Sequence, residues 1–387
     1  MSGPAEIRRW LEARREELVA LVVRLAELES PSTDPGSQRA VMDAIADALA
    51  LARMRSRRRA GKSSGGVLLA TRLERTHCAP YQLLLGHCDT VWAHGTLVDM
   101  PVTVEGDVVR GPGTFDMKAG IAIGVYALRA LAELGVPVEV EPALMITSDE
   151  EVGSNESERW IRRLARAADR VLVLEPASGP RGLIKTARKG VADFRLVVEG
   201  RASHAGLDPE AGASAIHEMA NLIPCIRALA DGREGVTLNV GLIEGGERTN
   251  VVAPRCSAAL DVRFARLADG RAVEEELRAL ETGIPGTTLH VTGGLDRAPL
   301  ERTPANIGLW ELLRRRAADV GVPLEQADIV GGGSDGNLTS PLAPTIDGLG
   351  PVGDGAHARH EHVLASSLPE RAAVLAWLLA APPVREA

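Results

Sequence analysis

Short apolar runs that lack helical periodicity recur along the first half of the chain, and polar residues follow each of them at once. The runs are 81–86, 138–147 and 171–174. Continuous apolar runs of this kind are typical of strands buried on both faces of a mostly parallel sheet. Because ligands of such sheets bind beyond the carboxyl ends of the strands, the residues that end these runs are candidates for chemistry. They are His87, the pair Glu150 and Glu151, and Glu175, and Asp116 lies at a loop-to-helix junction between them.

Segments with helical periodicity surround these strands, and the pattern changes once along the chain. Helices are predicted over about 5–30, 38–53, 121–134 and 306–318. Between 189 and 301 the strands alternate polar with apolar positions around a helix at 213–230, which is typical of a sheet with one solvated face and helices on the other. We therefore predict an α/β domain with a mostly parallel sheet, formed by 1–188 and 302–387, and an inserted α+β domain over 189–301.

Composition limits the classes of function that this fold can serve. The 387 residues exceed what one ordinary core holds, which agrees with two domains. Aromatic residues make up only 3% of the chain and its net charge is -8, so we expect no nucleic-acid partner. The amino terminus lacks the pattern of a secretory signal and no apolar run reaches the ~18 residues of a membrane helix, so we expect a cytoplasmic protein without a membrane partner. The basic run at 53–59 is interpreted as a solvated linker.

The candidate residues suit the binding of divalent metal ions. Such ions bind carboxylate oxygen and imidazole nitrogen, and two ions can share one bridging carboxylate at about 3.5 to 4 Å from each other. The candidate ligands are a histidine near the carboxyl end and His87, Asp116, Glu151 and Glu175. This set supplies two ligands for each ion and one carboxylate that bridges them. Asp89, two residues after His87 in an extended chain, would lie behind the imidazole and fix its tautomer. Taken without the other candidates, His87 and Asp89 could instead be a pair at a strand end that only caps a turn.

The adjacent acids Glu150 and Glu151 divide the expected chemistry between them. Neighbouring side chains on an extended segment diverge, so one carboxylate can bind metal while the other holds the attacking water and carries its proton to the leaving group. The spacing does not say which acid has which role. A solvated turn is the usual meaning of such a triplet of acids, but here the triplet ends a buried strand and precedes Gly153, which favours function.

Eight short motifs occur in an order and spacing that resemble one enzyme family. They are GHCDTVWAHGTL, GPGTFDMKAG, TSDEEVGS, VLEPAS, RKG, ASHAG, GGGSDGN and GAHARHEHV, over about 86–363. The set resembles the zinc-dependent exopeptidases and deacylases that include aminoacylase, acetylornithine deacetylase, succinyl-diaminopimelate desuccinylase and glutamate carboxypeptidase. The segments HCDTV, VEGDVVRGPG and ASHAGLDPEAG most closely resemble the glutamate carboxypeptidase, or carboxypeptidase G, branch.

The resemblance implies a role for each candidate residue around two zinc ions, in a site that also accepts cobalt or manganese. One ion would be held by His87, Asp116 and Glu175, and the other by Asp116, Glu151 and His357, with Asp116 bridging. Glu150 would be the general base, and Asp89 would orient His87. His357 is chosen among the nearby histidines because the family motif places the ligand four residues before a glutamate, here Glu361.

The inserted domain resembles the lid and dimerisation domain of the family, which implies a homodimer. His204 resembles the histidine that polarises the scissile carbonyl in the manner of an oxyanion hole, and the alternative is a histidine satisfied within its own loop. Further residues match positions that contact substrate: Asn250, Arg263, Arg297, Ser334 and Gly336. A guanidinium suits the clamping of a carboxylate, but Arg263 also lies on the same strand face as Asp261, and a salt bridge between these two residues is an equal alternative.

Together these expectations describe an amide hydrolase. We expect a dinuclear-metal hydrolase that cleaves a peptide or N-acyl amide bond next to a free carboxylate, as a glutamate carboxypeptidase does, with a peptide or N-acyl amino acid as its small-molecule substrate. The first alternative is an N-acyl-amino-acid deacylase of the aminoacylase or acetylornithine deacetylase type. The second, from a different class, is a non-catalytic relative that binds amino acids or peptides. The presence of every expected metal ligand and of Glu150 favours the enzyme.

Overall fold

The computed structural model describes residues 3–73 and 80–384, which belong to two compact units. The first unit comprises Met1–Thr186, Arg302–Asp328 and Ser334–Ala387, and the second comprises Ala187–Glu301 and Ile329–Gly333. Each unit has a hydrophobic core of its own. The fold is therefore explained one unit at a time.

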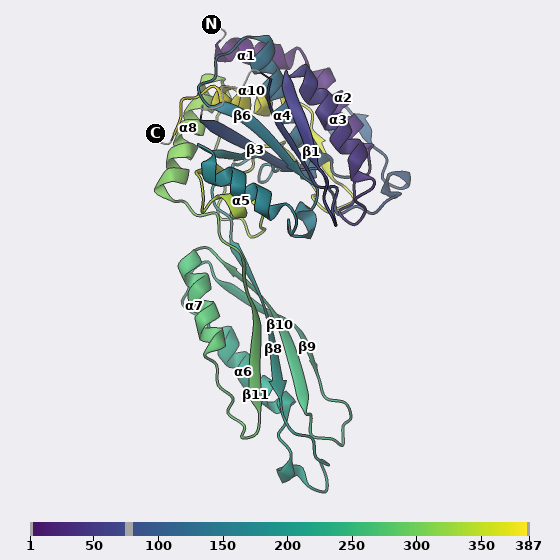
Figure 1. Ribbon diagram of the computed structural model, residues 1–387, viewed down its shortest axis with the longest axis vertical. Coiled ribbons are helices and arrows are strands. Elements are labelled where there is room, and N and C mark those ends of the chain that lie inside the picture. The colour runs from purple at the N-terminus through teal and green to yellow at the C-terminus, as the bar shows by residue number, and fades with distance from the viewer. Residues whose placement is uncertain (1–2, 74–79, 385–387) are drawn as a thin grey trace. The chain divides into compact units, whose positions relative to one another are not determined.

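A six-stranded sheet with the strand order β1-β2-β6-β3-β7-β12 forms the centre of the first unit (Figure 1). Its strands are β1 (Met54–Arg59), β2 (Val67–Arg72), β3 (Tyr81–His87), β6 (Glu141–Thr147), β7 (Val171–Val173) and β12 (Thr345–Ile346). β3 runs parallel to β6 and to β7, and β12 runs parallel to β7, whereas β2 is antiparallel to both β1 and β6. The predicted mostly parallel sheet is confirmed, and the carboxyl ends of β3, β6 and β7 meet at one edge.

Helices cover both faces of this sheet (Figure 1). On one face, Leu84, Leu144 and Leu172 share a core with six helices. These helices are α1 (Pro4–Glu12), α2 (Arg15–Ala26), α3 (Gln38–Leu51), α4 (Ala119–Glu133), α8 (Pro304–Asp319) and α10 (Ser367–Leu379). On the other face, Leu83 and Leu85 pack with α5 (Glu158–Ala167) and α9 (Asp335–Thr339). Because alternate side chains enter opposite cores, the inner strands β3 and β7 are apolar over most of their length, and each fully buried leucine contributes about 1.5–3 kcal/mol.

A smaller sheet in the first unit joins the carboxyl-terminal segment to the loops that precede α4. Its order is β13-β14-β5-β4, with the strands β4 (Thr103–Glu105), β5 (Val108–Arg110), β13 (Gly353–Asp354) and β14 (His362–Leu364). The same unit contains the short helical turns η1 (Thr96–Val98) and η2 (Thr114–Lys118), which flank β4 and β5 in the chain, and η3 (Glu150–Val152), which follows β6. In the pairing of β14 with β5, His362 lies opposite Arg110, so segments far apart in sequence become neighbours.

Two local expectations from the sequence are wrong. The helix predicted over 5–30 ends at Glu12 and resumes at Arg15. The basic run at 53–59 is no linker, because it forms the edge strand β1, whose Met54 is buried and whose Arg58 is 2.8 Å from Asp43 in an ion pair. Charged side chains on an edge strand oppose pairing with other chains, which explains how so basic a segment fits a sheet.

The second unit is a four-stranded antiparallel sheet with two helices on one face. Its strand order is β11-β8-β10-β9, with β8 (Gly190–Glu199), β9 (Thr237–Gly245), β10 (Arg255–Phe264) and β11 (Thr288–Arg297). The helices are α6 (Ala215–Ala228) and α7 (Leu267–Arg278), and a short turn, η4 (Pro209–Ala211), precedes α6. Along β10 every second residue, including Leu260 and Phe264, enters the core that Met219 and Leu277 supply from the helices. In neither unit do the described residues include a helix long and apolar enough to cross a membrane.

Candidate metal centre

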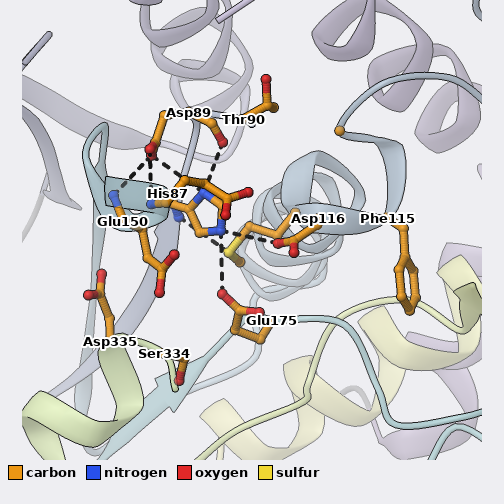
Figure 2. A network of polar contacts seen from close by, with 12 residues as sticks. His87, Asp89, Thr90, Phe115, Asp116, Glu150, Glu175, Ser334 and Asp335 are labelled. Atoms are coloured by element: carbon orange, nitrogen blue, oxygen red, sulfur yellow. Dashed lines mark hydrogen bonds and ion pairs between the residues drawn. The ribbon is translucent and has the colours of Figure 1, made fainter. Parts of the chain in front are cut away.

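His87 lies at the carboxyl end of β3 and turns its ring toward two carboxylates, as Figure 2 shows. Its Nε2 atom is 3.2 Å from Oδ1 of Asp116 and 3.4 Å from Oε1 of Glu175. Its Nδ1 atom is 3.0 Å from the backbone carbonyl oxygen of Asp89. Since a carbonyl oxygen only accepts, Nδ1 carries the proton of the neutral ring, and Nε2 is the nitrogen that can bind a cation among the acids.

Asp116 lies between two histidines. Its Oδ1 atom faces His87, while its Oδ2 atom is 3.4 Å from Nε2 of His357. That nitrogen of His357 is also 3.1 Å from Oε2 of Glu151. Ligand-type atoms of His87, Asp116 and Glu151 all lie within 4.8 Å of one another. The structure therefore brings all the expected ligands together, in two groups that share the Asp116 carboxylate.

Close packing of α4 against the end of β7 brings Asp116 to Glu175. Gly120, in the first turn of α4, approaches the chain so closely that a Cβ atom there would lie 2.0 Å from the backbone oxygen of Leu174. Only glycine permits such an approach. Because Leu174 directly precedes Glu175, this contact sets the distance between the segments that carry the two carboxylates.

The backbone of His357 adopts a conformation that is rare for a residue with a side chain. Its φ angle is 61°, in the left-handed region, which costs about 1–3 kcal/mol for a residue other than glycine. The turn is held by the N–H of Ala358, which donates to the carbonyl of Gly355 at 2.8 Å. The side chain of His357 is 52% exposed, whereas that of His87 is 1% exposed. Strain at a half-exposed histidine is typical of a functional position.

Charges within the cluster shift the pKa values of its members. Hydrogen bonds to Asp116 and Glu151 raise the pKa of His357 to about 10. Burial lowers the pKa of His87, but hydrogen bonds to Asp116 and two further acids raise it well above its ordinary value. Burial raises the pKa of Asp116, but its two histidine neighbours hold it far below its ordinary value. Positive charge in the cluster thus stabilises its buried carboxylates.

Two features of the cluster suit a pair of divalent cations. They are its set of donor atoms and one buried carboxylate oxygen that has no hydrogen-bond partner among the described residues. Its donors are two imidazole nitrogens and three carboxylates, a set that zinc, cobalt and manganese accept. Burial raises the pKa of Glu151. Its Oε1 atom is buried without a hydrogen-bond partner among the residues that the structure describes. A buried polar atom without a partner is costly, and a bound cation would supply one.

Asp89 connects the strand of His87 to the turn that carries both acids. Its Oδ1 accepts the N–H of Glu150 at 3.3 Å, and its Oδ2 accepts the N–H of Glu151 at 3.2 Å and the hydroxyl of Ser32 at 2.7 Å. The same carboxylate is 3.5 Å from Nδ1 of His87, farther than the backbone carbonyl of Asp89. The residue therefore places η3 next to the histidine and contacts the ring mainly through its main chain.

Figure 2 shows Ser334 and Asp335, at the amino terminus of α9, on the side of the cluster where Glu150 lies. The hydroxyl of Ser334 accepts the N–H of Gly336 at 3.1 Å and donates to Asp347 at 2.6 Å. Both Ser334 and Gly336 are buried. The amide of Gly336 is thus used within the helix cap, and substrate binding by these two residues stays a prediction.

His204 belongs to the second unit, where its side chain is exposed. Its Nδ1 atom accepts the N–H groups of Gly206 and Leu207, both at 3.1 Å. Because Nδ1 accepts, the proton of the neutral ring is on Nε2. The loop therefore presents the Nε2–H group outward as a hydrogen-bond donor.

The remaining substrate-binding candidates also belong to the second unit. Arg263 donates from Nε and Nη2 to the Asp261 carboxylate at 2.6–3.0 Å, so the salt bridge that the sequence left open is present. The carbonyl of Asn250 accepts the N–H of Ala205, next to His204. Arg297 is buried at the end of β11. Substrate contacts by these residues stay predictions.

Several residues that support the cluster were not among the predicted site residues. Ser32 binds Asp89, the Sδ atom of Met117 accepts the N–H of His87 at 3.3 Å, and Trp92 donates to Glu361 at 2.7 Å. Glu361 had a sequence signal through its spacing from the histidine ligand, and Trp92 through its place five residues after His87. The others act through contacts between distant segments, which no local pattern reveals.

The sequence matches a known protein family and several curated relatives. Residues 83–381 match the peptidase family M20/M25/M40. Carboxypeptidase G2 of Pseudomonas sp. (strain RS-16) is 31% identical over 301 residues, which cover 77% of this chain and 72% of that protein. A succinyl-diaminopimelate desuccinylase of Gluconacetobacter diazotrophicus is 28% identical over 321 residues, covering 78% of this chain and 80% of the other.

Solved structures share the fold. Aminopeptidase PepT of Bacillus cereus has a TM-score of 0.76 at 22% identity and covers 94% of this chain and 98% of its own. An M20 family metallo-carboxypeptidase of Sulfolobus solfataricus has a TM-score of 0.71 at 16% identity, with 94% and 98% covered. A dinuclear metal binding peptidase of the M20 family from Bacillus subtilis has a TM-score of 0.69 at 13% identity, with 95% and 98% covered. At these identities the likeness supports the architecture.

Proposed function

The chain belongs to peptidase family M20/M25/M40, and from this premise we propose that it is a dinuclear metallopeptidase of the glutamate-carboxypeptidase type. As a member of this family it is a metal-dependent hydrolase. Its proposed reaction is the cleavage of a peptide or N-acyl amide bond next to a free carboxylate. The observation that carries the proposal is Asp116, whose two oxygens face nitrogens of two different histidines, His87 and His357.

The proposed metals are two zinc ions, with cobalt or manganese as functional substitutes. The first would be held by His87, Asp116 and Glu175, and the second by Asp116, Glu151 and His357. When bound, the ions lower the pKa of water and polarise the scissile carbonyl. The support for this assignment is that each group of side chains is already assembled around Asp116.

Glu150 is proposed to move the proton. Its carboxylate takes a proton from the attacking water as the new C–O bond forms, and then donates it to the amide nitrogen as the C–N bond breaks, which releases a carboxylic acid and an amine. The backbone of Glu150 is held by Asp89, so the acid has a fixed place at the end of β6. A general base of this kind contributes about 10²–10⁴-fold to the rate.

The second unit is proposed to act as the lid and dimerisation domain of a cytoplasmic homodimer. His204 would donate its Nε2–H to the carbonyl oxygen of the substrate, in its own or in the partner subunit's site. The proposed substrate contacts come from both units: Asn250, Arg263, Arg297, Ser334 and Gly336. The orientation of the His204 ring by two backbone N–H groups supports its part in this scheme.

An N-acyl-amino-acid deacylase is the second candidate, and one observation favours it. Arg263, the proposed clamp for a substrate carboxylate, is engaged by Asp261 through both Nε and Nη2. A guanidinium that is occupied in this way offers fewer donors to the α-carboxylate and γ-carboxylate of a glutamate. The acyl group, rather than the released amino acid, would then set the specificity.

Mass-spectrometric screening of dipeptide and N-acyl amino acid libraries with the zinc-loaded protein separates these candidates. Release confined to C-terminal glutamate supports the carboxypeptidase, and preference for acetyl or succinyl amides supports the deacylase. The same protein with Glu150→Gln, loaded with zinc in the same way, is the control for contaminating activity. Absence of hydrolysis across both libraries by metal-replete protein would refute the proposed function.

A further inference from the structure

Glu361 is a fully buried carboxylate that binds the loops around the metal cluster. Its Oε1 atom accepts the backbone N–H groups of Phe115 at 2.9 Å and of Asp116 at 3.0 Å. Its Oε2 atom accepts the N–H of Gly113 at 2.9 Å and the indole N–H of Trp92 at 2.7 Å. A carboxylate has about four acceptor sites, so these donors use all of them. Glu361 is therefore engaged by protein donors and is no further metal ligand.

The donors and Glu361 itself come from three segments that carry proposed ligands. Trp92 follows His87 in the loop after β3, and Asp116 is the proposed bridge. Glu361 follows His357 in one turn, where its N–H donates to the carbonyl of Ala358 at 2.9 Å. One side chain thus connects the histidine of the first ion, the bridging carboxylate and the histidine of the second ion.

This connection fixes the backbone of Asp116 relative to both histidines. The two oxygens of Asp116 face His87 and His357 at 3.2 and 3.4 Å, and small rotations of its main chain would lose one of these contacts. The hydrogen bonds of Glu361 do not use the ligand atoms of Asp116, so they anchor the 113–116 backbone whether or not a cation is bound. Glu361 supplies that anchor through charge-assisted hydrogen bonds.

We propose that Glu361 is a positioning residue for the dinuclear centre, acting through Trp92 and the 113–116 backbone to hold Asp116 between the two histidines. This inference rests on the proposed function, which supplies the metal ions. A carboxylate that only stabilised the fold would change the melting temperature and leave metal binding by the folded protein as it is. A positioning residue changes the affinity and the coordination geometry of the ions.

The test is a titration of the metal-free full-length chain with cobalt(II). Calorimetry measures the affinity, and the visible absorption of the bound ion reports its coordination geometry. In Glu361→Gln one oxygen becomes an NH2 group, which cannot accept, so two of the four N–H groups lose their acceptor. We expect the affinity for at least one of the two ions to fall about 10- to 100-fold, as is typical when a hydrogen-bond partner of a ligand segment is removed. The cobalt spectrum changes as well, because Asp116 is no longer held in its bridging position.

A milder variant and a matched control accompany this titration. Trp92→Phe removes one of the four donors and keeps an aromatic ring, so a loss of affinity of about 3- to 10-fold is expected. Glu218 is another buried carboxylate, which accepts the N–H groups of Gly283 at 2.9 Å and of Ile284 at 2.7 Å, but it belongs to the second unit, which holds no proposed metal ligand. Glu218→Gln therefore lowers the melting temperature and leaves cobalt binding unchanged.

Unchanged affinity and spectrum in Glu361→Gln overturn the inference, and so does an equal loss of affinity in Glu218→Gln. If Glu361→Gln does not fold, the same titration of Trp92→Phe decides, and cobalt binding equal to that of the wild type overturns it. A wild-type chain that fails to bind two cobalt ions is a different result. It contradicts the proposed function itself, and the inference falls with it.

Discussion

Replacement of Gly120 by alanine tests whether the packing of α4 against β7 sets the geometry of the metal centre. The new Cβ atom would lie 2.0 Å from the backbone oxygen of Leu174, and contacts under 3.0 Å essentially never occur, so the two backbones must separate by at least 1.0 Å, the difference between these distances. Asp116 lies four residues before Gly120, and Glu175 directly follows Leu174. The shift therefore enlarges the space between two proposed ligands of the first ion. A misplacement of ~1 Å costs about 10²-fold in rate, and we expect kcat/KM to fall by about that factor.

Stability changes much less than activity in this variant. Alanine gains about 1 kcal/mol over glycine inside a helix, while the steric conflict costs about 1–3 kcal/mol, so the net loss is about 0–2 kcal/mol. The assay measures kcat/KM on the best substrate from the library screen, zinc affinity and thermal unfolding in parallel. Gly124→Ala is the matched control, because its Cβ would meet the flexible Cδ1 of Leu174 at 2.9 Å instead of a backbone atom. Unchanged zinc affinity and kcat/KM in Gly120→Ala, or an equal loss in Gly124→Ala, would refute the reasoning.

Two further changes test other parts of the site, and a third tests the contact of Glu156 with the 62–64 loop. Glu150→Gln should retain its metal content by elemental analysis and lose about 10²–10⁴-fold in kcat, and full turnover in this variant would contradict its role as general base. His357→Ala should bind one zinc ion in place of two, because the proposed second ion loses one of its three ligands; two ions at wild-type affinity would contradict its role as ligand. Although burial opposes it, hydrogen bonds from the 62–64 loop lower the pKa of Glu156 to about 2, below the ~4.3 of an unfolded chain. Its stabilising effect is therefore complete above about pH 4.3 and is lost as the pH falls toward 2, so the gap in melting temperature between wild type and Glu156→Gln should narrow over that window, and a constant gap would count against this account.

The sequence predicted those parts of the site that depend on strands. Strands buried on both faces are apolar over most of their length, so 81–86 and 171–174 could be recognised, and polar residues at their ends had to gather at one edge of the sheet. The assignment of Glu150 as general base and of Glu151 as metal ligand depended on family resemblance, because both acids follow the same strand and the pattern does not distinguish them. Arg263 shows the same limit, since a residue two positions from Asp261 on one face suits a salt bridge as well as a substrate.

The contacts that connect distant segments could not be predicted. Glu361 carries a polar side chain into a fully buried position, and its donors lie about 250 residues earlier in the chain. The approach of Gly120 to Leu174 depends on how α4 packs against β7, which hydrophobic periodicity does not specify. The basic run at 53–59 was misinterpreted because composition alone does not distinguish a solvated linker from an edge strand that exposes one side to water.

The assembly of the first unit from three separated stretches sets an order of events on the ribosome. His87, Asp116, Glu151 and Glu175 leave the exit tunnel with the first stretch, whereas His357 follows only after the whole second unit has been synthesised. Because helices α8 and α10 supply part of the core of the first unit, that core cannot be complete until these late residues have been synthesised. A polypeptide that stops before His357 therefore lacks one ligand of the proposed second ion, the Glu361 carboxylate and helix α10.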